Sequence, residues 1–561
     1  MMKTDYDLII AGGGLSGLAL SIQIKRERPE TSILILEKSQ EAAPTAAHKV
    51  GESTVELGSY YLRHVLGLKD YLEAHELPKH GLRFFFKSHN KKDITSRVEL
   101  GPRKWLVVPS HQLDRGTLEN YMAKHTQEMG NTLIRGAHVK DIEFGTVNSV
   151  TYKKGEVMHT VTGRWVADAA SRASLIKKKL DFLATTEHHA NAVWWRLKGV
   201  IDVDHWSEDT SWRNQLAPKL RYLSTVHFMD KGYWLWIIPL GSKNTSIGIV
   251  ADPAIHPLNT FNTYEKALEW LKVNEPLAYE KLAPETPNLL DFLQLKHYSH
   301  HTGRVFSAKE RWGVTGEAGA FLDPLYSPGT DFISMCNTWL SDLIMKDLDG
   351  EDIELRAKVY EQAYLTQVNN WLPVYLDKYT LMGNTQIMVF KIFWDWAVYW
   401  AVHCLLFTNK AFTNISILKR IFGNENGLGH RLGMLSKNMQ DMFLDWRDLE
   451  TTIFENRYID PYDLLYMREF QIGLEKQHEP MELLAKVEDN LKKLEQIAAA
   501  TFQLVSAEVK DTPLDMPVNP YTFSLKKDNN ACTEAEGAVI PSKEIMDDVK
   551  LMWFYQMKEL V

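Results

Sequence analysis

The chain has 561 residues, of which 45% are hydrophobic and 24% charged, a composition typical of a packed globular protein with several domains. A net charge of −8 at pH 7 argues against a generic nucleic-acid-binding protein. The three cysteines (Cys336, Cys404 and Cys532) form no CxxC pair, so we expect neither a disulfide framework nor a metal site. No signal peptide precedes the first predicted strand, which favours a cytoplasmic protein.

The first predicted elements form a βαβ unit. An apolar strand over Tyr6 to Ile10 is followed by the turn Gly12-Gly13-Gly14-Leu15-Ser16-Gly17, a helix to Arg28 and a second strand over Ser32 to Leu36. In this GxGxxG pattern Gly12 allows the tight turn, Gly14 lets the backbone approach a pyrophosphate, and Gly17 allows close packing of helix on strand. Glu37 and Lys38 follow, and Glu37 lies 20 residues beyond Gly17, where a carboxylate holds ribose hydroxyls. The unit predicts a dinucleotide site.

A second, sheet-rich region is predicted inside the first domain. Short β-like runs alternate with turns between about residues 80 and 315, interrupted by a helix from about Arg115 to Gln127. The runs are Leu82–Phe86, Trp105–Val108, Ala192–Leu197, Tyr233–Ile238 and Thr245–Val250. We therefore expect an α/β fold in which a Rossmann-like domain (1–330) is interleaved with a β-sheet substrate domain at about 80–110 and 185–300.

Helical periodicity dominates from 331 to 505, and we expect a mainly helical C-terminal region that covers the substrate. Within it, Ile387 to Phe407 is long enough to span a bilayer, but Lys391, Asp395 and His403 interrupt it. Because such charges are costly in lipid, we predict a buried or substrate-facing helix and no transmembrane span, with peripheral membrane contact left open. Residues 506–561 are predicted to form an extended tail ending in a helix from Lys543 to Leu560.

Two later segments favour FAD over a nicotinamide cofactor. Arg115 opens the predicted helix after residue 114, where it can reach cofactor phosphate or ribityl oxygens. A second glycine-containing turn carries Gly316, Glu317, Asp323 and Pro324 directly after the apolar run Trp312 to Val314. A turn of this kind can bring backbone N–H groups and an acid to the cofactor.

At these residues the chain resembles the flavin-dependent halogenases, a branch of the hydroxybenzoate-hydroxylase-like flavoproteins. The resemblance covers about residues 5–405 and rests on segments in the family's order. They are the GxGxxG turn, Val50–Thr54, Lys79–Phe84, Trp234–Pro239 and Gly316–Gly329. Trp234–Pro239 matches the family's WxWxIP signature at every fixed position.

The resemblance implies a mechanism and a set of site residues. Reduced FAD and O2 give a flavin hydroperoxide, which converts chloride or bromide to hypohalous acid, and a lysine matched by Lys79 passes the halogen to the substrate. Trp234 and Trp236 would separate flavin from substrate, Glu52 would lie near the passage between them, and Gly51 and Ser53 would contact the cofactor. Since no second GxGxxG with strand and helix context occurs, a separate NAD(P)H flavin reductase is expected to supply reduced FAD.

Three positions depart from the family's pattern. Glu317 replaces an aspartate, and Tyr326 stands where tryptophan halogenases carry a glutamate, which argues against free tryptophan as the substrate. Pro328 lies in the turn whose N–H groups would hold the halide and has no N–H to offer. Gly329 and Thr330 could still donate.

The leading hypothesis is a halogenase of secondary metabolism, such as antibiotic biosynthesis, acting on an electron-rich phenolic or resorcinol-like compound that is free or tethered to a carrier protein. The cluster Trp394, Trp396, Tyr399 and Trp400 would cover the substrate chamber. Pro328 favours the alternative, a related FAD-dependent monooxygenase or dehydrogenase without halide chemistry. A third hypothesis is a flavin-binding partner that has lost catalysis. His297, His300 and His301 leave open a covalent flavin tether.

Overall fold

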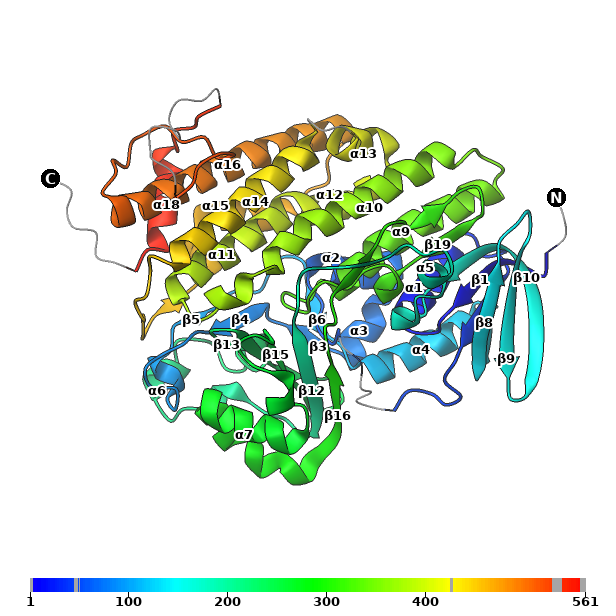
Figure 1. Cartoon of the computed structure of the whole chain (residues 1–561), viewed down its shortest axis with the longest axis horizontal. Coiled ribbons are helices and arrows are strands. Elements are labelled where there is room, and N and C mark those ends of the chain that lie inside the picture. Colours follow the sequence, from blue (N-terminus) through cyan, green and yellow to red (C-terminus); the bar gives the residue numbers. More distant parts are fainter. Residues whose placement is uncertain (1–3, 45–48, 50, 424–426, 527–536, 555–561) are drawn as a thin grey trace.

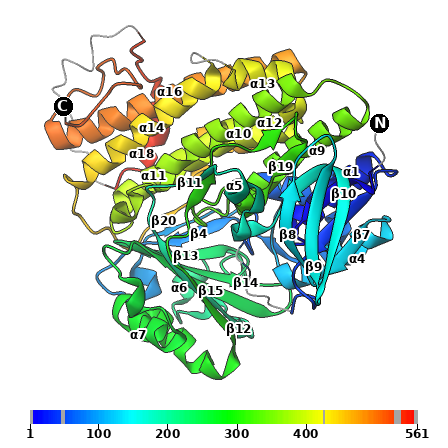
Figure 2. The ribbon, with the colours of Figure 1, turned by 45° about the vertical axis from the view of Figure 1, so that its right-hand side comes forward.

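The computed structural model describes residues 4–44, 49, 51–423, 427–526 and 537–554. Two eight-stranded sheets lie beneath a layer of long helices (Figure 1). Turning the molecule by 45° separates the sheet that begins at the N-terminus from the second sheet (Figure 2). This combination of mixed sheets and a helical C-terminal region confirms the predicted α/β fold class.

The first sheet has parallel strands at its centre, in the order β18-β19-β10-β1-β2-β7, with β8 and β9 attached to β10. The strands are β1 (Tyr6–Ala11), β2 (Ile33–Glu37), β7 (Thr132–Arg135), β8 (Ala137–Glu143), β9 (Asn148–Lys154), β10 (Val157–Asp168), β18 (Phe306–Ser307) and β19 (Trp312–Val314). Leu8 to Ala11 and Leu34 to Leu36 are almost completely buried, as the apolar runs of central parallel strands should be. Helices α1 (Leu15–Glu27) and α4 (Arg115–Glu128) pack together on this sheet.

The second sheet is mostly antiparallel, in the order β16-β12-β15-β14-β13-β4-β5-β20. Its strands are β4 (Leu82–Phe85), β5 (Glu99–Leu100), β12 (Asn191–Lys198), β13 (Thr225–Asp230), β14 (Tyr233–Pro239), β15 (Asn244–Ala251), β16 (Leu289–Leu295) and β20 (Tyr458–Ile459). Two small sheets join β3 (Leu77–Lys79) to β6 (Ser110–Gln112) and β11 (Leu183–Thr185) to β17 (His300–Thr302). The two-residue strand β20 comes from the helical region, and so short a strand carries no sequence periodicity.

The predicted strand at Trp105–Val108 is wrong. This segment is irregular, and Pro102 and Pro109 bracket it. The N–H of Val107 donates to the Gln471 side-chain oxygen at 3.0 Å instead of to a neighbouring strand. A side chain from the helical region therefore takes the place of a sheet partner.

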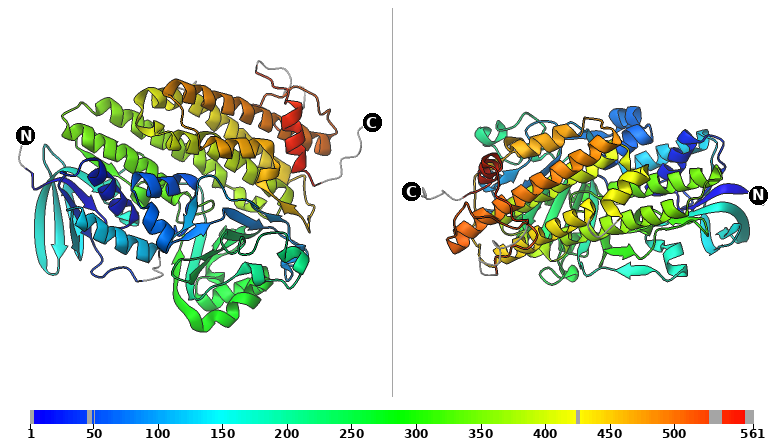
Figure 3. Two further views of the ribbon diagram at one scale, coloured as in Figure 1. Left: turned by 180° about the vertical axis from the view of Figure 1, so that it is seen from behind. Right: turned by 90° about the horizontal axis from the view of Figure 1, so that it is seen from above.

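In the helical layer, α14 lies between α10 and α16 and packs against both, as the view from above shows (Figure 3). Its helices are α9 (Gly329–Leu348), α10 (Glu354–Tyr375), α11 (Thr385–Val398), α12 (Leu405–Thr408), α13 (Ile415–Phe422), α14 (Leu428–Arg447), α15 (Leu465–Gly473), α16 (Pro480–Lys510) and α18 (Lys543–Leu551). The shorter helices elsewhere are α2 (Glu56–Tyr60), α3 (Lys69–His75), α5 (Leu175–Lys179), α6 (Thr210–Arg213), α7 (Tyr264–Asn274) and α8 (Pro276–Leu282).

The C-terminal segment packs more closely than the predicted extended tail. Helix α16 continues to Lys510, and Val518 pairs with Val539 in a short antiparallel bridge. The predicted end of the last helix at Leu560 is too late, because α18 ends at Leu551 and Trp553 then stacks on Trp446. Residues 555–560 of that prediction lie outside the described residues.

One described helix, Thr385–Thr408, is long and apolar enough to cross a membrane, and 83% of its apolar window is buried inside the protein. The expectation of a buried helix is confirmed. A π-helical segment, Tyr399–Cys404, interrupts it between α11 and α12. Such bulges often occur at functional sites because they rotate the side chains that follow.

Candidate active site

The predicted cofactor-binding turns meet at one edge of the first sheet. Strands β1, β2, β10 and β19 run parallel, so their carboxyl ends face the same way. The turn after β1 carries Gly12 to Gly14, the turn after β10 follows Asp168, and the turn after β19 carries Gly316 to Gly319. A crevice at the carboxyl ends of parallel strands is where such folds bind dinucleotides.

The three fingerprint glycines differ in the space around them. A Cβ on Gly12 would lie 2.3 Å from the Ala169 carbonyl oxygen, and one on Gly17 would lie 2.1 Å from the Gly12 oxygen. A Cβ on Gly14 would meet nothing closer than the Glu119 carboxylate at 3.8 Å. Gly12 and Gly17 are thus needed for packing, whereas Gly14 faces open space. Among the residues that the structure describes, no side chain caps the first turn of α1, so its N–H groups are suited to bind a pyrophosphate.

Charged groups surround this turn. Glu37 accepts a hydrogen bond from the Gly13 N–H at 2.7 Å, while Lys38 is exposed. Arg115 forms an ion pair with Glu119 at 2.5 Å and donates to the Gly51 carbonyl at 3.3 Å. Arg115 therefore lies between α4 and the Gly51 segment. These donors and the uncapped helix fit the phosphates of FAD.

The acidic side chains of the turn after β19 form hydrogen bonds to other protein groups. Glu317 accepts a hydrogen bond from Ser171, and Asp323 is buried. One Asp323 oxygen, Oδ2, accepts from Tyr298, Tyr379 and His188, each at 2.7 Å. The other oxygen, Oδ1, accepts from the Leu325 N–H at 2.9 Å, so the Asp323 side chain stabilises its own turn.

Ser16 and Ser53 also have protein partners. The Ser16 carbonyl accepts from Asn337 at 3.0 Å, and the Ser53 hydroxyl bonds to Thr225 at 2.9 Å. Leu15 is buried as the first residue of α1. His300 lies against the second turn, where its ring Nε2 is 2.9 Å from the Glu317 carbonyl oxygen, to which it can only donate.

A cavity lies where the helical layer meets the N-terminal half. Its wall is mostly apolar and aromatic, as expected for a site that holds a flat organic ligand. Trp396, Tyr399 and Trp400 from the predicted aromatic cluster line it. Trp394 does not, and its indole instead lies 3.4 Å from the Ser436 hydroxyl.

Lys79 lines this cavity from the end of β3 and is only 3% exposed. Its Nζ donates to the Thr54 carbonyl at 2.6 Å. Burial lowers the pKa of Lys79 from 10.5 to about 7, although the carboxyls of Glu56 and Asp331 oppose the shift. The neighbouring Lys87 is one-third exposed and lies 3.7 Å from Asp230.

Sequence reasoning missed Glu56 and Asp331, which share the cavity wall with Lys79. Glu56 begins α2 and accepts from the Trp400 indole at 2.9 Å. Asp331, in the first turn of α9, accepts from the Gly58 N–H at 2.8 Å and from the Tyr399 hydroxyl at 2.9 Å. Burial raises the pKa of both carboxyls, to about 8 for Asp331. Neither residue could be recognised from the sequence, because only the fold brings α2 and α9 to the cavity that Lys79 lines.

Glu52 lies elsewhere. It forms a buried ion pair with Arg196 of β12 at 2.7 Å, and burial raises its pKa. Trp234 and Trp236, with ring centroids 5.6 Å apart, are buried on β14. The Trp234 indole donates to Tyr379 at 3.0 Å, and Tyr379 in turn donates to Asp323. This chain of contacts ties the tryptophan pair to the second cofactor turn.

The predicted halide turn leads into α9. Pro328 precedes the helix, and Gly329 and Thr330 are its first two residues. Their N–H groups belong to a first turn that no side chain caps. A Cβ on Gly329 would meet no atom of the described part of the chain within 4 Å, which leaves open space beside it.

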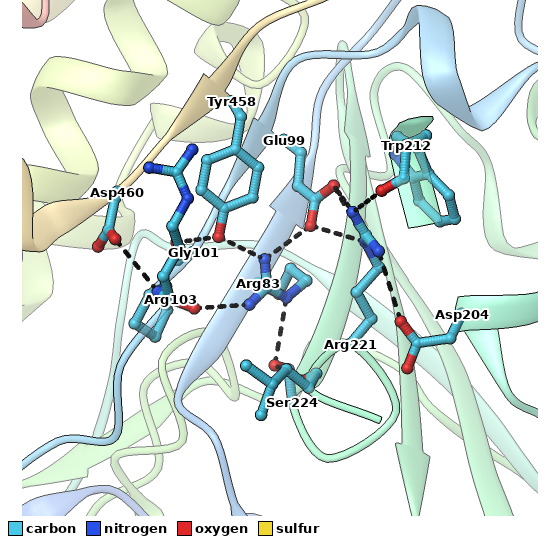
Figure 4. A network of polar contacts seen from close by, with 12 residues as sticks. Arg83, Glu99, Gly101, Arg103, Asp204, Trp212, Arg221, Ser224, Tyr458 and Asp460 are labelled. Carbon is cyan, nitrogen blue, oxygen red and sulfur yellow. Dashed lines mark hydrogen bonds and ion pairs between the residues drawn. The ribbon is translucent and has the colours of Figure 1, made fainter. Parts of the chain in front are cut away.

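A buried network of charges holds one wall of the cavity (Figure 4). Glu99 accepts from Arg83 at 2.6 Å and from Arg221 at 3.0 Å, and all three side chains are essentially unexposed. Arg83 also donates to the Pro102 carbonyl at 2.9 Å and to the Tyr458 hydroxyl at 3.1 Å. Because Pro102 lines the cavity, this network positions the wall and joins it to the helical region.

Comparison with known proteins agrees with this geometry. The FAD binding domain family matches residues 5–246. Flavin-dependent halogenase chlA of Dictyostelium discoideum is 26% identical over 480 residues, covering 79% of this chain and 76% of that protein. A brominase of 1H-pyrrole-2-carbonyl on a peptidyl-carrier protein, from Pseudoalteromonas luteoviolacea, is 22% identical and covers 62% of this chain and 79% of that protein.

Solved structures share the fold. Halogenase PltM in complex with phloroglucinol and FAD superposes with a TM-score of 0.61 at 15% identity, covering 87% of this chain and 96% of PltM. A flavoprotein/dehydrogenase from Cytophaga hutchinsonii superposes with a TM-score of 0.55 at 16% identity, covering 78% of this chain and 92% of that chain. Together with the cofactor crevice, these findings show that the chain is an FAD-dependent enzyme and that it is similar to the flavin-dependent halogenases.

Proposed function

We propose that this protein is an FADH2-dependent halogenase in which Lys79 passes the halogen to an electron-rich aromatic substrate. The observation that carries the proposal is the Lys79 amine itself, buried in the wall of an aromatic cavity with a pKa near neutrality. A lysine is costly to bury, and a desolvated amine of this kind is a feature of functional sites.

The cofactor site fits FAD. The uncapped first turn of α1, the open space at Gly14 and the Arg115 guanidinium supply donors for the two phosphates. Reduced FAD, when bound, supplies the chemistry that uses O2 to oxidise chloride or bromide to hypohalous acid. We expect a separate NAD(P)H flavin reductase to deliver the reduced flavin.

Lys79 can act on hypohalous acid in two ways. Its amine can hydrogen-bond the acid, or an N–H bond can break while an N–halogen bond forms and water leaves. The second way needs a share of neutral amine, which the lowered pKa of Lys79 provides at pH 7. The aromatic carbon then takes the halogen, and the amine is restored when it regains a proton.

The halide would bind at the first turn of α9, where the N–H groups of Gly329 and Thr330 are available in place of the one that Pro328 lacks. Asp331 belongs to the same turn and, if ionised, would repel an anion. Because burial raises the pKa of Asp331 to about 8, its carboxyl is mostly protonated at pH 7 and leaves the halide undisturbed.

The substrate class follows from the cavity. Trp371, Trp396 and Trp400 in its wall suit a flat aromatic body. The relatives include a brominase of carrier-bound pyrrole, and the solved PltM complex contains phloroglucinol. These names support an electron-rich aromatic substrate, free or attached to a carrier protein.

The test is turnover with a flavin reductase, NADH, FAD and bromide, using a panel of phenols and resorcinols. Mass spectrometry should show the bromine isotope doublet on the product. Lys79→Met should abolish bromination while FAD binding is retained, and Lys87→Met is the matched control because that partly exposed lysine lies eight residues away. Bromination that survives in Lys79→Met would disprove lysine delivery.

Pro328 keeps one alternative open, a related FAD-dependent monooxygenase or dehydrogenase without halide chemistry. The same assay separates the two functions. An added oxygen or a loss of hydrogen, with no bromine in any product, would favour the alternative.

A further inference from the structure

A second polar group lies in the wall of the same cavity. It is centred on Asp395 of α11, whose Oδ2 accepts from the Lys391 ammonium at 2.5 Å and from the Tyr326 hydroxyl at 3.0 Å. The other carboxylate oxygen, Oδ1, accepts from the Gln440 amide at 2.8 Å. Asp395 and Tyr326 line the cavity, and Lys391 and Gln440 hold Asp395 from behind.

This arrangement costs the fold free energy in two ways. The Lys391–Asp395 pair is almost entirely buried, with side chains 1% and 5% exposed, and an apolar pair of similar size is often at least as stable. Tyr326 and Ser327 have φ values of 69° and 62°, in the left-handed region that residues other than glycine rarely adopt. Strain of this kind accumulates at ligand-binding and catalytic sites.

The backbone strain has a visible consequence. The left-handed turn directs the Tyr326 hydroxyl to Asp395 and places its ring 6.3 Å from Phe84, with the Lys391 ammonium 5.9 Å from the Tyr326 ring centroid. The packing of Tyr326 and the hydrogen bonds to Asp395 thus fix the orientation of the carboxylate.

The unused bonding capacity of Asp395 indicates the ligand. An ionised carboxylate can accept about four hydrogen bonds, and three protein donors are present, two of them on Oδ2. Oδ1 can accept another. Because Asp395 lines the cavity and Lys391 does not, a ligand meets the acceptor and not the cation. The site therefore suits a hydroxyl or N–H donor and disfavours a carboxylate.

We propose that Asp395 binds a hydroxyl group on the aromatic ring of the substrate, with Lys391, Gln440 and Tyr326 as its positioning residues. The inference deepens the proposed function and rests on it for the reaction, in which the hydrogen bond would enrich the ring in electrons for attack on the halogen at Lys79. It makes Asp395 the residue that selects phenols over their ethers.

The test compares the binding of 4-hexylresorcinol and its dimethyl ether to FAD-loaded enzyme without reductant or halide. Quenching of tryptophan fluorescence reports occupancy, since Trp371, Trp396 and Trp400 line the cavity. The wild type should bind the diol about tenfold to a hundredfold more tightly than the ether, the ratio expected for a hydrogen bond to a charged group. Equal affinity of the wild type for the two compounds would overturn the inference.

The variant Lys391→Met/Asp395→Leu replaces the buried pair by apolar side chains of similar size. This variant should lose most or all of the preference for the diol. It should keep the wild-type affinity for the ether, and that retained affinity would show that the cavity is intact. If this variant does not fold, Asp395→Asn decides, because the amide keeps the shape and weakens the acceptor. A preference equal to that of the wild type in the folded variant would refute the role of Asp395.

The control is Glu354→Leu/Lys358→Met on α10, an ion pair with the same spacing at 2.8 Å whose side chains are 68% and 72% exposed. It should bind both compounds as the wild type does. Bromination by the wild type is measured separately. A preference for the diol without bromination would refute the proposed function but not the role of Asp395 in binding. Bromination without a preference for the diol would refute the role of Asp395 but not the proposed function.

Discussion

Replacing Lys79 by methionine should stabilise the protein while it abolishes delivery of the halogen. Burial lowers the pKa of Lys79 from 10.5 to about 7, so holding the charged amine inside the fold is unfavourable. The difference between the two values corresponds to about 5 kcal/mol. Loss of the hydrogen bond to the Thr54 carbonyl takes back about 1 kcal/mol. Loss of the electrostatic attraction between Lys79 and the Glu56 and Asp331 carboxyls reduces the gain in stability further. The net gain in the free energy of unfolding is about 3 kcal/mol near pH 7.

The gain should depend on pH in a defined direction. Between about pH 7 and pH 10.5 the unfolded chain binds a proton at Lys79 that the folded protein does not, so the wild type gains stability as the pH rises. Lys79→Met lacks this dependence. Its advantage should be full at or below about pH 7 and should shrink toward about pH 10.

The assay is thermal unfolding of both FAD-loaded proteins at a series of pH values. We expect Lys79→Met to melt at the higher temperature at pH 7 and the difference to narrow as the pH rises. The control Lys87→Met replaces a partly exposed lysine and should show no such gain. A lower melting temperature for Lys79→Met, or a difference that does not change with pH, would refute the account of a desolvated amine.

Two other substitutions probe the cofactor turn and the second sheet. Gly14→Ala should fold normally and bind FAD more weakly in a flavin-fluorescence titration. Gly12→Ala should yield little folded protein, because its Cβ would lie 2.3 Å from a carbonyl oxygen. If the two variants behave alike, the proposed geometry of the turn is wrong. Glu275→Leu should lower the free energy of unfolding by about 3–5 kcal/mol, because it leaves the fully buried Arg97 guanidinium without its carboxylate partner at 2.5 Å. Urea unfolding measures this change, and a loss below about 1 kcal/mol would show that the Arg97 charge finds another partner.

Local sequence signals predicted the elements that depend on neighbours in the chain. The βαβ unit, the helix at Arg115 and the strands β12, β14 and β15 all lie close to their predicted bounds, because glycine turns and apolar runs are local properties. Where long-range contacts decide, prediction was wrong. Trp105–Val108 has the composition of a strand, yet Gln471 takes its backbone donor.

The candidate site divides along the same line. The family motif and its place in the sequence identified Lys79 as a site residue without the structure. The partners of Lys79 could not be found in this way. Glu56 and Asp331 are 275 residues apart in the sequence and meet only because α2 packs on the first turn of α9.

What the sequence by itself determined is that the chain has a dinucleotide-binding unit and the ordered motifs of a flavin-dependent halogenase. What only the tertiary structure decided is the chemical character of the groups in the cavity. The pKa of Lys79 and the orientation of Asp395 come from burial and from contacts between segments distant in the chain. Because desolvation depends on everything packed around a group, no local pattern of residues can encode it.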